Sequence, residues 1–249
     1  DILNKDKDNL TKDKDNLIKD KDIFANLATV TSDIANTSVS AMKYLMAYHK
    51  DTPALKSIND FTSFTDEYED DNKLVYALIS EYRNDTLAAK LSNHLVLEYK
   101  KEDPSKQSIW SSDVGRLTYV IRNAVSDGRV IWSTDKNGIQ VTTIVIKPIL
   151  NYVKPILQKF HLDRSNEILN NPNLKNSKMI EISEYQKLAV QIIMLIDNKT
   201  LERDIIKHMA PQFYWNKNSF TKQPTIEYTE DKQDKQDKQI EYKEIKHIR

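Results

Sequence analysis

The amino-acid sequence predicts a mostly α-helical protein with one small β-hairpin. Apolar residues recur at helical spacing through most of the 249-residue chain. Only three glycines occur, which is too few for a turn-rich all-β fold. An Asn-Gly pair at 137–138 separates two runs of strand-like composition, and this pair favours a tight hairpin turn.

The N-terminal residues 1–27 repeat every seven residues, with the sequences KDKDNLT, KDKDNLI and KDKDIFA. One apolar residue per heptad lies near a single helical stripe, and lysine occupies the second seam position, where a strong coiled coil needs an apolar residue. We therefore expect a charged helical linker or a weak oligomeric coiled coil.

Three helices are expected before residue 100. After a Ser/Thr-rich linker (28–40), the first helix ends before Pro53, and two core-facing helices follow in the segments 72–85 and 86–101. His94 lies beside an apolar face, and we expect it to pack there rather than bind a metal, because no second ligand stands at metal-site spacing.

The segment SIWSSDVGRLTYVIRN predicts a further helix over 113–126. Ser112 is a suitable N-cap, and Gly128 is suited to follow the last turn. The runs RVIWS and IQVTTIVI then predict the two strands of the hairpin, joined by TDKNG.

The last part of the chain predicts further helices and a low-complexity tail. A helix starts near Pro148 and is kinked or broken at Pro155, an Asn-rich connection follows residue 163, and the helix at 185–197 is apolar nearly all round. The expected organisation is a charged helix (1–27), a helical domain (28–164) with a winged-helix-like core (73–147), a C-terminal helical segment (165–222) and a DKQ-repeat tail (223–249).

The order helix, helix, helix, hairpin over 73–146 is that of a winged helix, whose third helix enters the DNA major groove. Residues 105–164 carry nine basic and four acidic residues within a chain of zero net charge, which is a local excess of +5. We expect the third helix and the hairpin wing to contact nucleic acid, because Arg and Asn suit base edges and Tyr can reach phosphate. The candidate residues are Arg116, Tyr119, Arg122, Asn123, Arg129 and Lys136.

Composition and motifs point away from catalysis. The absence of cysteine excludes disulfides, thiolate catalysis and Cys-based metal sites. The sequence contains no paired histidines, P-loop or nucleophile elbow, and the acidic run 66–71 fits a solvated segment better than a weak divalent-cation site. We expect no catalytic residue, no cofactor and no metal, and no apolar run or signal peptide indicates a membrane partner.

Three segments resemble the C-terminal regions of uncharacterised giant DNA virus proteins: SVSAMKYLMAYHKDTPALKSI, YKKEDPSKQSIWSSDVGRLTYVIRN and NGIQVTTIVIKPILNYV. In that set a DPxKQSIWxxDxxRLTYxIR core follows a Lys/Asp-rich linker, often behind a KilA-N or Bro-type DNA-binding module. The resemblance covers roughly 38–160 and implies a viral, DNA-associated context without a catalytic residue. The chain starts with Asp rather than Met, so we expect it to be a fragment. The matching residues are Asp103, Pro104, Lys106, Gln107, Ser108, Ile109, Trp110, Asp113, Arg116, Leu117, Thr118, Tyr119, Ile121 and Arg122.

The leading hypothesis is therefore a non-enzymatic, DNA-binding or DNA-associated viral module that binds double-stranded DNA. The alternative is a structural or protein-interaction module that forms a homo-oligomer through the N-terminal helix or the 185–197 helix. A third hypothesis is an accessory domain of a nuclease whose catalytic part lies elsewhere. The expected location is the host cytoplasm, in a viral factory, or the virion.

Overall fold

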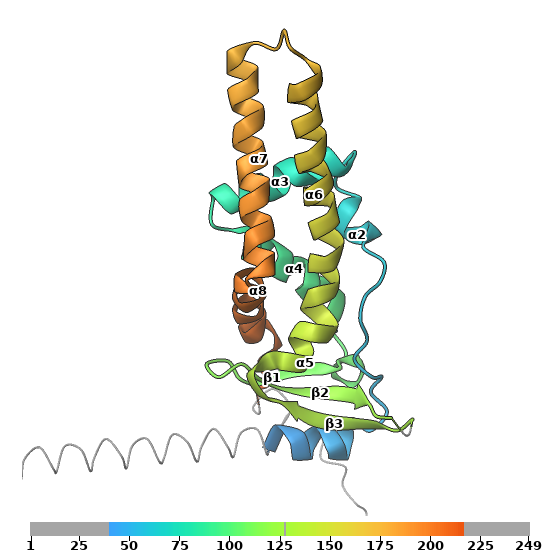
Figure 1. Cartoon of the computed structure of the whole chain (residues 1–249). Helices are drawn as coiled ribbons and strands as arrows, with labels where there is room; N and C mark the ends of the chain where they lie inside the picture. Colours follow the sequence, from blue (N-terminus) through green and yellow to red (C-terminus); the bar gives the residue numbers. More distant parts are fainter. Residues whose placement is uncertain (1–39, 127, 217–249) are drawn as a thin grey trace, which may run out of the picture. The chain divides into compact units, whose positions relative to one another are not determined.

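The computed structural model describes residues 40–126 and 128–216 (Figure 1). Both the heptad segment 1–27 and the tail 223–249 lie outside the described residues. The first described helix spans 40–48, and the elements after it, in chain order, are α2 (Thr62–Thr65), α3 (Asp71–Arg83), α4 (Leu87–Tyr99), β1 (Ile109–Asp113), β2 (Thr118–Ala124), β3 (Val130–Asp135), α5 (Ile139–Val141), a π-helical turn (Thr142–Ile146), α6 (Lys147–Asn170), α7 (Asn176–Asp197) and α8 (Thr200–Met209).

The structure confirms a mostly helical fold with a small antiparallel sheet. The helices predicted in the segments 72–85 and 86–101 form as α3 and α4. The carboxylate of Asp70 caps α3 by accepting a 2.8 Å hydrogen bond from the Lys73 amide, and Leu74 and Leu78 on its inner face are buried. Local capping and helical periodicity therefore agree with the tertiary structure in this part of the chain.

The helix predicted over 113–126 is wrong. Asp113 ends β1, residues 114–117 form a turn, and 118–124 form β2, the central strand of the order β1-β2-β3. Tyr119, Val120 and Ile121 are consecutive and all fully buried, because helices cover both faces of this strand. A strand buried on both faces has no polar–apolar alternation, and here its apolar residues coincided with helical spacing.

The predicted hairpin is also only half formed. The first run forms β3, which pairs with β2, but residues 139–146 are helical and continue directly into α6. Asn137 and Gly138 adopt positive φ angles, as a tight turn requires, yet the turn leads into a helix. The buried carboxylate of Asp135 caps that helix by accepting hydrogen bonds from the amides of Gln140 (3.0 Å) and Val141 (2.9 Å). The winged-helix arrangement is therefore not confirmed.

Helices α6 and α7 form a long antiparallel helical hairpin (Figure 1). Helix α6 contains Pro155 and runs on to Asn170, and the connection to α7 is confined to 171–175, much shorter than the Asn-rich stretch expected after residue 163. The domain boundary expected at 164/165 lies within α6. The apolar 185–197 segment is the second half of α7, where Ala189, Ile192 and Ile196 are buried.

The main core lies between the helical hairpin, α3, α4, α8 and one face of the sheet. Helix 40–48 lies on the opposite face, so the sheet is enclosed between this helix and the helical body (Figure 1). The residues that follow α8 lie along the β1 edge of the sheet, where the Trp215 amide donates to the Ser111 carbonyl at 2.8 Å. Among the described helices, none is long and apolar enough to cross a bilayer.

Candidate functional site

Three of the six candidate nucleic-acid residues lie at the ends of the sheet, and the other three lie within β2. Arg116 lies in the β1–β2 turn and Lys136 follows β3, and the Tyr119–Asp135 register places both at one end. Arg129 lies at the opposite end, just before β3. The Arg116 side chain is 53% exposed, and its Nε lies 3.9 Å from the carboxylate of Asp113, whose side chain is only 10% exposed.

Tyr119 is a core residue rather than a contact for phosphate. Its side chain is fully buried, and its hydroxyl donates a 3.2 Å hydrogen bond to the backbone carbonyl of Ile206 in α8. Burial, with a smaller effect of the nearby Asp135 carboxylate, raises the pKa of this phenol. The residue therefore ties the central strand to α8 and cannot reach a ligand without unfolding.

Arg122 and Asn123 also bind groups of their own chain. The guanidinium of Arg122 donates to the carbonyls of Thr52 (Nε, 3.2 Å) and Lys50, and lies 5.8 Å from the centre of the Trp132 ring. The Asn123 amide donates to Ser133 Oγ (2.9 Å) and Gln140 Oε1 (2.5 Å). Both side chains therefore hold neighbouring segments against the sheet.

The set of residues proposed to read a DNA groove is not brought together on one surface. Without a helix at 113–126, the major-groove geometry on which the hypothesis rested is absent. Nucleic-acid binding itself stays a prediction, and Arg116, Lys136 and Arg129 are the residues of the set that lie on the surface. The signal that the sequence interpretation missed is the run TYVIR, in which aromatic and β-branched residues are typical of a strand.

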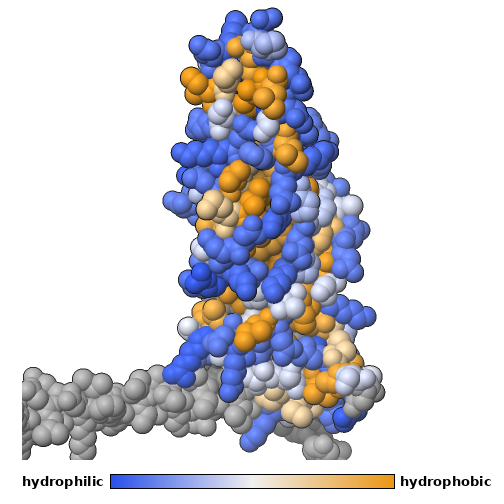
Figure 2. Space-filling view, in the orientation of Figure 1, coloured by the Kyte–Doolittle hydropathy of each residue, from blue (hydrophilic) through white to orange (hydrophobic). Residues whose placement is uncertain are grey.

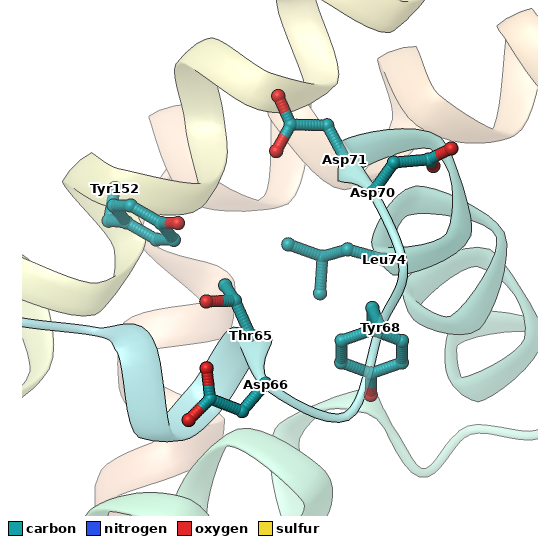
Figure 3. Close-up of a pocket in the computed structure, with 7 residues that line it drawn as sticks. All are labelled: Thr65, Asp66, Tyr68, Asp70, Asp71, Leu74 and Tyr152. Carbon is teal, nitrogen blue, oxygen red and sulfur yellow. The ribbon is translucent and has the colours of Figure 1, made fainter.

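The acidic run 66–71 contributes to a pocket of about 320 Å³ beside α3 and α6 (Figure 3). The Asp70 carboxylate already caps α3, and Asp66 and Asp71 line opposite sides of the pocket. Within the described residues, no group of three or more His, Cys, Asp or Glu side chains is arranged to hold a metal ion. The pocket is lined by Thr65, Asp66, Tyr68, Asp70, Asp71, Leu74 and Tyr152.

The described histidines form no catalytic pair. His94 packs with its ring centre 4.9 Å from that of Phe64, and burial lowers its pKa. In α6, the His161 carbonyl accepts a 3.1 Å hydrogen bond from the Gln186 side chain of α7. These interactions join helices, which agrees with the packing role expected for His94.

The distal end of the helical hairpin exposes large apolar side chains. Leu162 and Leu169 on α6 are 61% and 77% exposed, and Ile180 on α7 is 68% exposed. Figure 2 shows hydrophobic residues gathered at this end and bordered by hydrophilic ones. We call Leu162, Leu169 and Ile180 the distal patch. Single exposed apolar residues are common, but three large ones near the end of one protruding hairpin make that end suited to an interaction.

Comparisons with known proteins found no matching family model, no similar curated protein and no similar solved structure.

Proposed function

We propose that this chain is a protein-interaction module that self-associates through the distal end of the α6–α7 hairpin. The observation that carries the proposal is the distal patch, in particular Leu162 and Leu169 on the outer surface of α6. They are seven residues apart, which is about two helical turns, so they lie on the same face of the helix.

A second copy is a suitable occupant because this face is complementary to itself. In an antiparallel pairing of α6 with α6 of another copy, Leu162 of each copy meets Leu169 of the other, as a two-fold contact requires. The position midway between the leucines is held by Ser165 and Asn166, so no like charges meet at the centre of this pairing. The hairpin is braced by α3, which packs on both of its helices.

The strength of such a contact can be bounded. Burying two leucines from each copy contributes at most roughly 1.5–3 kcal/mol per side chain, or about 6–12 kcal/mol in all, because both are partly covered in the monomer. Association costs about 4–15 kcal/mol in lost translational and rotational freedom. We therefore expect a weak dimer that forms with increasing concentration rather than an obligate one.

Sedimentation velocity over a concentration series tests the proposal. The wild-type sedimentation coefficient should rise with concentration, and the Leu162→Lys/Leu169→Lys variant should remain monomeric. Leu97→Lys is the matched control, because Leu97 is 79% exposed on α4 and its variant should associate as the wild type does.

Two results would contradict the proposal. The first is a wild-type protein that stays monomeric over the whole concentration series, because it then does not self-associate. Undiminished association of the double variant would assign the contact to another surface, such as the heptad segment 1–27. In parallel, fluorescence anisotropy with a duplex DNA at low salt tests the nucleic-acid hypothesis, for which steeply salt-dependent binding lost in Arg116→Ala is the supporting result.

A further inference from the structure

Helix 40–48 is attached to the sheet through a group of aromatic side chains. The Trp132 indole N–H donates a 3.0 Å hydrogen bond to the carbonyl of His49, the residue that follows the helix. The Tyr44 ring lies 5.6 Å from the His49 ring and 6.3 Å from the Trp215 ring, centre to centre. We call Tyr44, His49, Trp132 and Trp215 the docking cluster.

His49 is a buried polar residue of this cluster whose side chain makes no hydrogen bond. Its side chain is only 7% exposed, and within the described residues neither Nδ1 nor Nε2 has a hydrogen-bond partner. A neutral imidazole carries one donor and one acceptor, whereas the protonated ring carries two donors and a positive charge. The neutral form therefore suits this site, and the charged form would be buried without an acceptor.

The charged groups around His49 do not provide that acceptor. The acidic group whose charge acts on it is Asp103, but His49 makes no hydrogen bond to this carboxylate, whose Oδ1 accepts from the Ser105 amide (2.9 Å) and hydroxyl (2.7 Å). On the sheet side, the Arg122 guanidinium binds the Lys50 carbonyl directly after His49, and it adds a positive charge.

The remaining titratable group of the docking cluster is Tyr44, whose pKa is raised by burial, so it is neutral at the pH values that matter here. The pKa of His49 is lowered by burial, and the Asp103 charge opposes this only in part.

We propose that His49 is an acid-sensitive latch, and that protonation of its buried imidazole releases helix 40–48 from the sheet. The proton comes from solvent, and the released imidazolium is hydrated. Because the pKa of His49 is lower in the docked state, docking is strongest above the ordinary histidine pKa near 6.5 and weakens as the pH falls below it. This inference is independent of the proposed self-association.

Acrylamide quenching of tryptophan fluorescence reports the release directly. The three tryptophans of the chain, Trp110, Trp132 and Trp215, are all nearly buried, and two of them belong to the docking cluster. Quenching measures access of the probe to the rings, so it separates release from a direct effect of imidazolium on emission. In the wild type the quenching constant should rise between pH 7.5 and 5, with the docking equilibrium changing at most about tenfold per pH unit for one proton.

Variants assign the effect to one residue. His49→Phe and His49→Gln cannot be protonated in this range, and both should keep the low quenching constant at pH 5. His94→Phe is the matched control, because His94 is also a histidine whose pKa is lowered by burial, and this variant should open as the wild type does. Circular dichroism at pH 7.5 shows whether each variant is folded.

A wild type whose quenching constant is the same at pH 7.5 and pH 5 would overturn the proposal without recourse to any variant. The proposal also fails if a folded His49 variant opens with acid as much as the wild type does. Loss of the acid response in both His49 variants, together with its retention in His94→Phe, is the supporting result.

Discussion

Replacement of Gly138 by alanine should destabilise the protein far more than the same replacement at Gly128. Both glycines have positive φ angles, +61° and +83°, so alanine costs roughly 1–2 kcal/mol in backbone strain at either position. A Cβ at Gly138 would lie 2.1 Å from Cδ1 of Ile206 and 3.2 Å from Cε2 of Tyr119, whereas a Cβ at Gly128 has no neighbour within 4 Å. Overpacking at the buried Ile206 adds about 1–3 kcal/mol.

The expected loss in the free energy of unfolding is therefore about 3 kcal/mol for Gly138→Ala and about 1.5 kcal/mol for Gly128→Ala. Urea unfolding followed by circular dichroism measures both. Ile206→Val removes the atom that clashes, so Gly138→Ala/Ile206→Val should be more stable than additivity predicts, by about 1 kcal/mol. Equal losses at the two glycines, or strict additivity in the double variant, would refute the packing of the 136–138 turn against α8.

Three further outcomes follow from buried polar groups. Asp135→Ala leaves two capped amides of the helix at 139 without an acceptor and should lower the free energy of unfolding by about 2–3 kcal/mol in urea titration. The control is Asp60→Ala, which removes an exposed 3.0 Å hydrogen bond from the Thr62 amide and should leave the melting temperature nearly unchanged. Burial raises the pKa of Tyr99 to about 12, so its contribution to stability is complete below pH 10 and lost as the pH rises towards 12, and Tyr99→Phe should flatten a melting-temperature profile there. Tyr119→Phe removes the hydrogen bond to the Ile206 carbonyl and should cost about 1 kcal/mol, while leaving any DNA affinity measured by anisotropy unchanged.

The sequence predicts the helices whose periodicity and caps agree with their packing. Helix α3 is the best example, because its apolar stripe and the Asp70 cap both mark the same element. The prediction of a helix at 113–126 is wrong for a physical reason. Because β2 is enclosed between two helical layers, it lacks the alternation of polar and apolar residues by which a strand is recognised. The opposite error occurs at the β-branched residues 141–146, which were predicted to form a strand but are helical. Burial of Val145 and Ile146 in a helical core outweighs their strand propensity.

The candidate site residues also divide into those whose position a local pattern predicts and those whose position it does not. Arg116 and Lys136 were expected on the surface and lie there. Tyr119 and Arg122 were expected to contact nucleic acid, but their partners are the carbonyls of Ile206 and Lys50, which lie in distant segments that no local pattern reveals. Sequence spacing assigns residues to a face only after the type of element is known, and the distal patch became visible only once α6 and α7 were paired.

Distances between copies test the central claim, self-association through the hairpin, most directly. The sequence contains no cysteine, so Asp163→Cys allows one spin label to be placed beside Leu162, with Leu97→Cys as the control on α4. Electron–electron dipolar spectroscopy at high protein concentration should give a short distance between copies for the label at 163 and a clearly longer one, or none, for the label at 97. The absence of a signal between copies at 163, or a shorter distance at 97, would contradict the account.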